Sequence, residues 1–295
     1  MADLLKARGL CKSRDGFELK DVDLSVPEGS VVGFIGANGA GKTTTIQAVL
    51  GLIGRDGGSV ELFGNSMDGA NEGMEVAVKN RIGVVFDSCS FPDTVNVAEA
   101  GRCMAAVYSH WDGGRFASLC ASFELPEKRK IKELSRGMGM KLMLAVALSH
   151  GAELLLLDEA TAGLDPMARD ELLDILRGFM EAEGHGILMS SHITSDLERI
   201  ADCIVCIDEG QVVFACKKDD ITESAGIARC RADQLDEVAA SGLFEVGELY
   251  YSQHKYGVDV LAGDRAAFAS RFPEMVLDRM TIDDYMALRL KGSVR

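Results

Sequence analysis

The stretch GANGAGKTT, residues 36–44, decides the fold of this chain. Glycine adopts backbone angles closed to other residues and has no Cβ, so a glycine-rich turn can aim successive amide groups at one oxyanion. Gly36, Gly41, Lys42 and Thr43 match the pattern G-x-x-x-x-G-K-[ST], in which the lysine reaches the outer phosphates of a nucleotide and the hydroxyl binds Mg²⁺. The stretch therefore predicts a phosphate-binding loop.

The flanks of this loop have the order that such a loop requires. The preceding run VVGFIG, residues 31–36, is apolar and short enough for a buried strand. The following run TTTIQAVLGL, residues 43–52, is typical of a helix, whose N-terminus would add a partial positive charge beside the phosphates. The sequence therefore predicts a strand, a loop and a helix around one anion.

Composition narrows the class of protein. With 295 residues, 47% of them hydrophobic, the chain can form one large α/β domain and a smaller one. The formal net charge of −15 argues against a general nucleic-acid-binding surface, so we expect no nucleic-acid partner. We see no apolar run long enough to cross a membrane and no signal-peptide pattern in residues 1–16, so we expect a cytoplasmic location.

The arrangement of apolar runs predicts an α/β fold with a mostly parallel sheet. Runs of three to five residues alternate with longer helical patterns, which is typical of parallel strands covered by helices. The first 30 residues and residues 58–63 are expected to form short strands of a peripheral antiparallel sheet, and residues 93–125 an inserted helical block. The predicted parallel strands are 31–35, 82–86, 154–157, 187–189 and 203–207.

The pattern changes after about residue 217. Residues 249–262 carry two β-rich runs about a turn, which predicts a hairpin, and Thr281 is a weak capping signal for a last helix. We therefore expect a nucleotide-binding domain over 1–217, with its helical insertion at about 90–150, and a small α+β domain of unknown role over 218–295. Cys203 and Cys206 form a C-x-x-C pair that suggests metal or redox chemistry, but buried reduced thiols are favoured because the pair lies in a strand-like run.

Two further apolar strands end in groups that can act on a phosphate. ELLLLDEA, residues 153–160, ends in Asp158 and Glu159, of which the first could hold Mg²⁺ and the second polarise a water molecule. An acidic helix start is the competing interpretation. ILMSSHI, residues 187–193, ends in His192, and a histidine in isolation is more often structural than catalytic.

Taken together, these segments resemble the nucleotide-binding subunit of an ATP-binding cassette (ABC) transporter over roughly residues 1–215. LSRGM (134–138) resembles the cassette signature, usually LSGGQ, and AGLD (162–165) resembles the loop that couples two sites. The resemblance implies ATP and Mg²⁺ as ligands, Glu159 as general base, His192 at the γ-phosphate, and Thr43, Asp158 and Asp87 at the metal. The nucleotide-binding positions that it implies are Gly36, Asn38, Gly39, Ala40, Gly41, Lys42, Thr43, Thr44, Ser135, Gly137, Asp165 and Arg14.

The resemblance also implies partners. In the family, ATP lies between the phosphate loop of one subunit and the signature of the other, so we expect a homodimer or a pair with a paralogous subunit. We further expect a separate integral membrane permease that holds the pair at the inner face of the cell membrane. ATP binding would close the pair and hydrolysis would reopen it, which is a ligand-biased two-state motion.

This chain departs from the family pattern at three places. Asp87 stands where the family usually has a glutamine, and Arg14 aligns with the aromatic residue that stacks on adenine, although Phe17 could take that role. Arg136 and Met138 replace the glycine and glutamine of the signature, as in a bacterial branch that often serves exporters. A soluble cassette ATPase acting on ribosomes or DNA, or an ATP-sensing regulator, remains the alternative.

Overall fold

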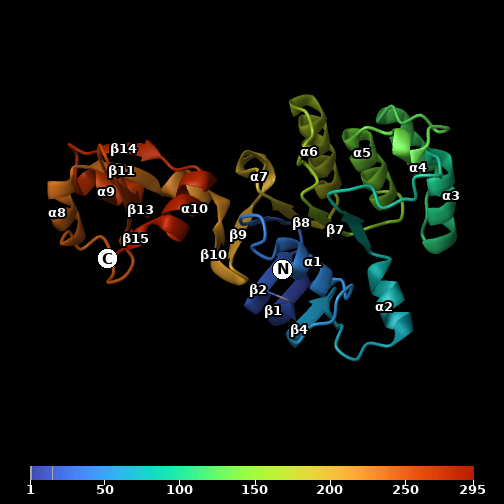
Figure 1. Ribbon diagram of the computed structural model, residues 1–295, viewed down its shortest axis with the longest axis horizontal. Coiled ribbons are helices and arrows are strands. Elements are labelled where there is room, and N and C mark those ends of the chain that lie inside the picture. Colours follow the sequence, from blue (N-terminus) through green and yellow to red (C-terminus); the bar gives the residue numbers. More distant parts are fainter. Residues whose placement is uncertain (1, 15) are drawn as a thin grey trace.

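The computed structural model describes residues 2–14 and 16–295, and its centre is a mostly parallel sheet (Figure 1). The strand order is β10-β9-β3-β8-β7-β6, with β10 antiparallel to β9 and the other neighbours parallel. The parallel sheet expected from the apolar runs is confirmed. The strands are β3 (Val31–Ile35), β6 (Ile82–Val85), β7 (Leu154–Asp158), β8 (Gly186–Ser191), β9 (Cys203–Asp208) and β10 (Gln211–Lys217).

The two faces of this sheet bury two different cores. Successive side chains of a strand point to opposite faces, so Val31 and Ile35 belong to one cluster while Val32 and Phe34 belong to the other. The first cluster is completed by the helices α5 (Arg136–Ala147), α6 (Pro166–Met180) and α7 (Thr194–Ile200). The second is completed by α1 (Lys42–Val49) and by the N-terminal strands. Burial on both faces explains why these strands are continuous apolar runs.

The N-terminal strands form an antiparallel sheet in the order β2-β1-β4-β5. We expected short strands here, but β1 and β2 are 12 and 11 residues long. Register shifts interrupt their pairing, and Asp21 adopts a positive φ of 52°, so the alternation of apolar and polar residues breaks within each strand. That break makes one long strand look like two short ones. The strands are β1 (Asp3–Arg14), β2 (Phe17–Pro27), β4 (Gly57–Leu62) and β5 (Asn65–Ser66).

A helical block is inserted between β6 and β7, and it lies at one end of the molecule (Figure 1). It has its own buried cluster, in which Phe116 and Cys120 of one helix pack with Leu142 of α5. A separate helix, α2 (Glu72–Lys79), precedes β6 and was not expected from the sequence. The block consists of α3 (Val97–Val107), α4 (Gly113–Ser122) and α5. Within residues 2–14 and 16–295, no helix has the length and hydropathy to cross a membrane.

The C-terminal tail forms a third, antiparallel sheet in the order β14-β11-β13-β12-β15, at the opposite end of the molecule (Figure 1). The predicted hairpin is β12 with β13, and Thr281 caps α10 by accepting a hydrogen bond from Asp284 N at 3.1 Å. The elements are β11 (Gly226–Cys230), α8 (Leu235–Ala239), β12 (Tyr250–His254), β13 (Gly257–Ala262), α9 (Arg265–Arg271), β14 (Val276–Arg279), α10 (Ile282–Lys291) and β15 (Ser293–Val294).

The tail packs against β10 and α7. Phe214 of β10 meets Tyr285 of α10 edge to face at 4.9 Å, and Ile282 N donates a hydrogen bond to Glu198 Oε1 of α7 at 2.9 Å. Buried residues of the C-terminal tail also belong to the hydrophobic cluster that α5, α6 and α7 complete on one face of the parallel sheet. β10 ends at Lys217, but the division into domains at 217–218 stays a prediction because this cluster runs across it.

Candidate functional site

The loop between β3 and α1 is packed so tightly that two of its glycines have no room for a side chain. A Cβ on Gly36 would collide with the carbonyl oxygen of Ile207. Gly41 has a φ of 120°, and a Cβ there would lie 2.7 Å from Leu19 Cδ2. Gly41 is also the N-cap of α1, so the loop brings backbone amides and the positive end of the helix dipole to one place.

Lys42 lies folded over this loop and is only 6% exposed. Its Nζ donates hydrogen bonds to Gly36 O at 2.7 Å and Ala37 O at 3.3 Å, and lies 3.3 Å from Glu159 Oε1. The carbonyl contacts orient the ammonium group, and the carboxylate partly balances its charge. A buried lysine held in this way presents a fixed positive charge to an anion above the loop.

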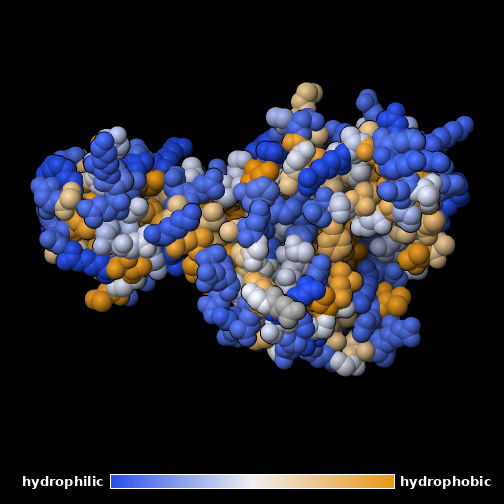
Figure 2. Space-filling view, in the orientation of Figure 1, coloured by the Kyte–Doolittle hydropathy of each residue, from blue (hydrophilic) through white to orange (hydrophobic). Residues whose placement is uncertain are grey.

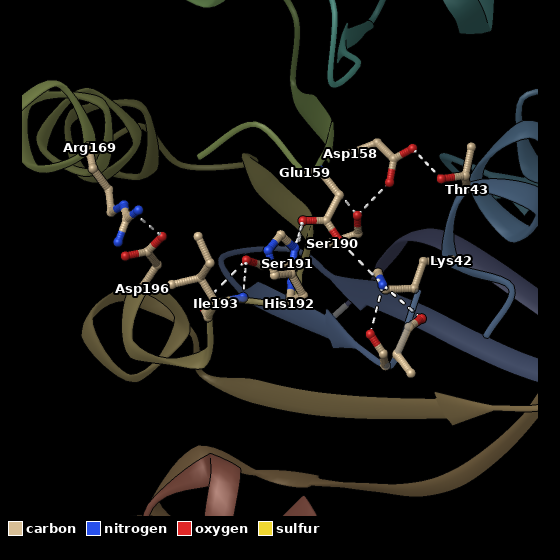
Figure 3. A network of polar contacts seen from close by, with 12 residues as sticks. Lys42, Thr43, Asp158, Glu159, Arg169, Ser190, Ser191, His192, Ile193 and Asp196 are labelled. Carbon is tan, nitrogen blue, oxygen red and sulfur yellow. Dashed lines mark hydrogen bonds and ion pairs between the residues drawn. The ribbon is translucent and has the colours of Figure 1, made fainter. Parts of the chain in front are cut away.

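Two hydroxyl groups hold the carboxylate of Asp158, the last residue of β7, which is 3% exposed. Thr43 Oγ1 donates to Asp158 Oδ2 at 2.7 Å, and Ser190 Oγ donates to Asp158 Oδ1 (Figure 3). The three groups come from α1, β7 and β8, whose ends meet at one edge of the sheet. Carboxylate and hydroxyl oxygens are the hard donors that Mg²⁺ prefers, so Thr43 and Asp158 fit a magnesium site next to the loop.

Glu159 follows directly and its carboxylate lies between two basic side chains. Its Oε2 is 2.5 Å from His192 Nδ1, while Oε1 faces Lys42 (Figure 3). Glu159 has a φ of 54°, and its backbone N donates to Ser190 O at 3.1 Å and to Ser190 Oγ at 3.2 Å. A positive φ on a non-glycine residue is strained, and such strain is concentrated at functional sites. The strained turn aims a carboxylate at the mouth of the loop.

Lys42, Thr43 and Glu159 border a pocket of about 560 Å³, a volume within the usual range for small-molecule sites. Arg14 and Phe17, which are paired across the β1–β2 hairpin, form one of its walls. The pocket therefore combines an aromatic ring and a guanidinium group on one side with amides and a cation on the other. The lining residues are Arg14, Phe17, Asn38, Gly39, Gly41, Lys42, Thr43, Thr44 and Glu159.

Other residues expected at the site lie outside this pocket. Ser135 is the exposed N-cap of α5, accepting a hydrogen bond from Met138 N at 3.2 Å, and Gly137 follows in the first turn. Asp165 caps α6 by accepting from Ala168 N at 3.0 Å. Asp87 is exposed, two residues beyond β6, beside the strand that carries Asp158. Among the described residues, these four do not line the pocket with the phosphate loop.

The structure also brings in residues that the sequence analysis missed. Ser190 holds Asp158 and the backbone of Glu159, as described above, and its signal was a polar residue closing an apolar strand. Arg169 of α6 and Asp196 of α7 form an ion pair next to the turn that carries His192 (Figure 3). Residues 169 and 196 looked like ordinary surface charges of amphipathic helices, so the sequence held no signal for their pairing.

Cys206 and Cys203 behave differently from a metal-binding pair. Cys206 is buried in the core beneath α6 and α7, and burial raises the pKa of its thiol to about 12. Cys203 is half-buried rather than fully buried. Within the described part of the chain, no cluster of three or more His, Cys, Asp or Glu side chains is placed to hold a metal ion, so Cys203 and Cys206 have no further ligands of this kind.

The fold and the site define a P-loop nucleotide-binding protein, in which a strand, a glycine-rich loop and a helix meet carboxylates at the end of a neighbouring strand. A family model described as "ABC transporter" matches residues 19–162. The chain is 32% identical over 260 residues to the daunorubicin/doxorubicin resistance ATP-binding protein DrrA of Streptomyces peucetius, which covers 85% of this chain and 77% of that protein. It is 33% identical over 214 residues to the bacitracin transport ATP-binding protein BcrA of Bacillus licheniformis, covering 72% and 67% of the two chains.

Solved structures agree with this assignment. The structure of an ATP-binding subunit of an ABC transporter superposes with a TM-score of 0.66 at 27% identity, over 74% of this chain and 91% of that chain. The dimeric structure of an ATP-binding cassette bound to ADP and Pi has a TM-score of 0.65 at 21% identity, covering 72% and 98%. The chain belongs to the family of ABC transporter ATP-binding proteins and is an ATP-binding ATPase, and the expected fold class is confirmed.

Proposed function

We propose that this chain is the motor subunit of an exporter, in which two subunits pair around ATP and drive a separate membrane permease. The permease would hold the pair at the inner face of the cell membrane. Export is supported by the relatives, one named for daunorubicin/doxorubicin resistance and another for bacitracin transport. The transported compound is chosen by the permease, so the proposal names no cargo.

One observation supports the proposed dimer. The motif residues fall into two groups, one around the pocket and the other at the exposed starts of two helices, Ser135 on α5 and Asp165 on α6. A serine N-cap and a helix dipole form an anion-binding end that its own pocket does not use. A second copy would bring Ser135 and Gly137 to the γ-phosphate held by the first, and would place Asp165 between the two sites.

Within the pocket, each side chain has a role that its position supports. Lys42 would bind the β- and γ-phosphates, Phe17 or Arg14 would cover the adenine, and Glu159 would accept the proton of the attacking water. Thr43 and Asp158 would hold Mg²⁺, with Asp87 close by, and the bound ion would neutralise charge that develops on the phosphates. His192, which contacts Glu159, would orient that carboxylate and reach the γ-phosphate.

The contact between Lys42 and Glu159 suggests how the site is controlled. The Lys42 ammonium group lies 3.3 Å from the Glu159 carboxylate. The γ-phosphate of ATP would compete for the ammonium group, and the released Glu159 would then be free to turn toward water. Binding of ATP and release of the Glu159 carboxylate from Lys42 would then be one event.

The test is a comparison of oligomeric state with hydrolysis blocked. Glu159→Gln keeps the shape of the side chain but cannot accept a proton, so hydrolysis should fall by about 100-fold or more and an ATP-bound dimer should accumulate. Size-exclusion chromatography with light scattering would measure the dimer with Mg²⁺ and ATP, and the matched control is the same variant with ADP. A Glu159→Gln protein that stays monomeric at every concentration and with every co-purified membrane partner would refute the proposal. ATP-dependent sedimentation with ribosomes would instead favour the soluble alternative.

A further inference from the structure

Two ion pairs join α6 and α7, and they differ in burial. Arg169 Nε of α6 lies 3.6 Å from Asp196 Oδ2 of α7, while Arg199 of α7 pairs with Asp170 of α6. The Asp196 side chain is 2% exposed, whereas that of Asp170 is 58% exposed. An exposed pair is screened by water, whereas the charge on Asp196 is not, so a change at the first pair has the larger electrostatic consequence.

The buried pair lies next to both loops that serve the site. Arg169 is in the first turns of α6, and its backbone N donates to Asp165 O at 3.0 Å. Asp196 is in the first turn of α7, and its backbone N donates to Ile193 O at 3.3 Å. Each charged group therefore stands one turn beyond a candidate site residue, Asp165 on one side and His192 on the other.

The turn that carries His192 is itself closed by hydrogen bonds. Ser191 Oγ donates to Ile193 O at 3.3 Å and accepts from Ile193 N at 2.9 Å (Figure 3). The turn cannot shift without moving the start of α7, and Asp196 ties that start to α6. A continuous set of contacts thus runs from Arg169 through Asp196 and Ile193 to His192, whose ring holds Glu159.

The charged groups of Arg169 and Asp196 lie near each other without forming a hydrogen bond. At 3.6 Å the two atoms attract each other but are beyond hydrogen-bonding distance, and among the described residues neither Arg169 Nε nor Asp196 Oδ2 has a hydrogen-bond partner. A buried polar atom in this state is unfavourable, so the pair favours any movement that shortens the contact. A displacement of less than about 1 Å between α6 and α7 would be enough.

We propose that Arg169 and Asp196 are positioning residues for ATP hydrolysis, which set His192, and through it Glu159, according to the position of α6. The inference rests on the proposed function, because it assigns these residues to the same site. When a second copy engages the loop ending at Asp165, α6 moves, the pair closes, and His192 takes its working position. The ion pair thus makes hydrolysis depend on dimerisation, although neither of its residues contacts the nucleotide.

The first test separates catalysis from nucleotide binding. In Asp196→Asn and Arg169→Gln, the kcat of the full chain with Mg²⁺ and ATP should fall by about 10- to 100-fold, because small displacements of catalytic groups have effects of that size. KM for ATP and the Kd for ADP should stay within about twofold, since the pocket itself is intact. Asp170→Asn removes the exposed carboxylate of the same helix pair and is the matched control, with kcat expected within about twofold.

The second test asks whether the two residues act as a unit. The double variant Arg169→Gln/Asp196→Asn should lose no more kcat than the worse single variant, because one contact can be lost only once. Arg169→Lys keeps the positive charge and should recover much of the activity lost in Arg169→Gln. These readouts hold even where thermal stability falls, provided that ADP binding shows a folded pocket.

Each outcome decides one of the two ideas. If Asp196→Asn keeps the wild-type kcat, if its kcat and KM change together as ADP binding is lost, or if the losses in the double variant multiply, the positioning role is wrong and the proposed function stands. If the unaltered chain hydrolyses no ATP in any pairing, the proposed function fails and the positioning role fails with it.

Discussion

The Thr43 hydroxyl lies 2.7 Å from the Asp158 carboxylate, which joins the first turn of α1 to the end of β7 across 115 residues of sequence. The two residues belong to different sequence motifs, and the parallel order of β3, β8 and β7 brings them to the same edge of the sheet. The contact is partly buried, and the surface around it mixes hydrophilic residues with smaller hydrophobic patches (Figure 2). The oxygen donors proposed for Mg²⁺ are therefore assembled by the fold.

Ser190→Ala should weaken Mg²⁺ binding although Ser190 is not proposed to touch the metal. Its hydroxyl orients the Asp158 carboxylate and meets the backbone N of Glu159, and loss of such a supporting contact lowers metal affinity by about 10-fold or more. A Mg²⁺ titration of ATPase activity would measure the shift. Ser149→Ala removes another buried hydroxyl, which bonds Ala145 O at 2.6 Å far from the site, and should leave the titration unchanged.

Lys42→Ala should weaken ATP binding by about 10- to 100-fold, because a charge-assisted contact to the phosphates is lost. Isothermal titration calorimetry with ATP and Mg²⁺ would measure the change. Lys79→Ala is the control, since Lys79 is partly exposed and forms an ion pair with Glu75, one turn away, at 3.2 Å. Equal ATP affinity in Lys42→Ala and the control would contradict the assignment of the phosphate loop.

Phe17→Ala should weaken ATP binding by about 10-fold while leaving tripolyphosphate binding unchanged, because stacking acts on the base and not on the phosphates. Phe17 lines the pocket, and its Cζ would lie 2.9 Å from a Cβ placed on Gly41. Arg14→Ala, tested in parallel, separates the two candidates for the adenine wall. A base-specific loss in Arg14→Ala, with none in Phe17→Ala, would assign the stacking to the guanidinium group.

His150 should make the fold sensitive to mild acid. Burial lowers the pKa of His150 below its ordinary 6.5, and its ring stacks on Tyr108 at 3.9 Å with Nδ1 facing Asn80 O at 3.1 Å. Because the unfolded chain takes up the proton first, stability is fully present above about pH 6.5 and is lost as the pH falls toward the lowered folded value.

The check compares the free energy of unfolding at about pH 8 and about pH 5.5. His150→Phe keeps an aromatic ring against Tyr108 but cannot titrate, so the difference between the two conditions should shrink. His110→Phe changes an exposed histidine on the neighbouring loop and is the control. An unchanged pH dependence in His150→Phe would show that other groups cause the acid sensitivity.

Much of the fold follows from patterns within single segments. The apolar runs predict β3, β6, β7, β8 and β9 because strands buried on both faces are apolar along most of their length. The apolar residues on one side of a regular repeat over 169–180, with Pro166 near its start, predict a helix there, and α6 spans Pro166–Met180. The lengths of β1 and β2 did not follow, since bulges shift the alternation within each strand.

The sequence by itself determined the phosphate loop, because glycine and lysine act there through the backbone of nine adjacent residues. Only the tertiary structure decided which side chains contact one another in and around the site. The contacts of Ser190 with Asp158, of Lys42 with Glu159 and of Arg169 with Asp196 join segments separated by 27 residues or more. A polar side chain gives no local sign of its distant partner, because the partner is set by how strands are ordered and helices packed.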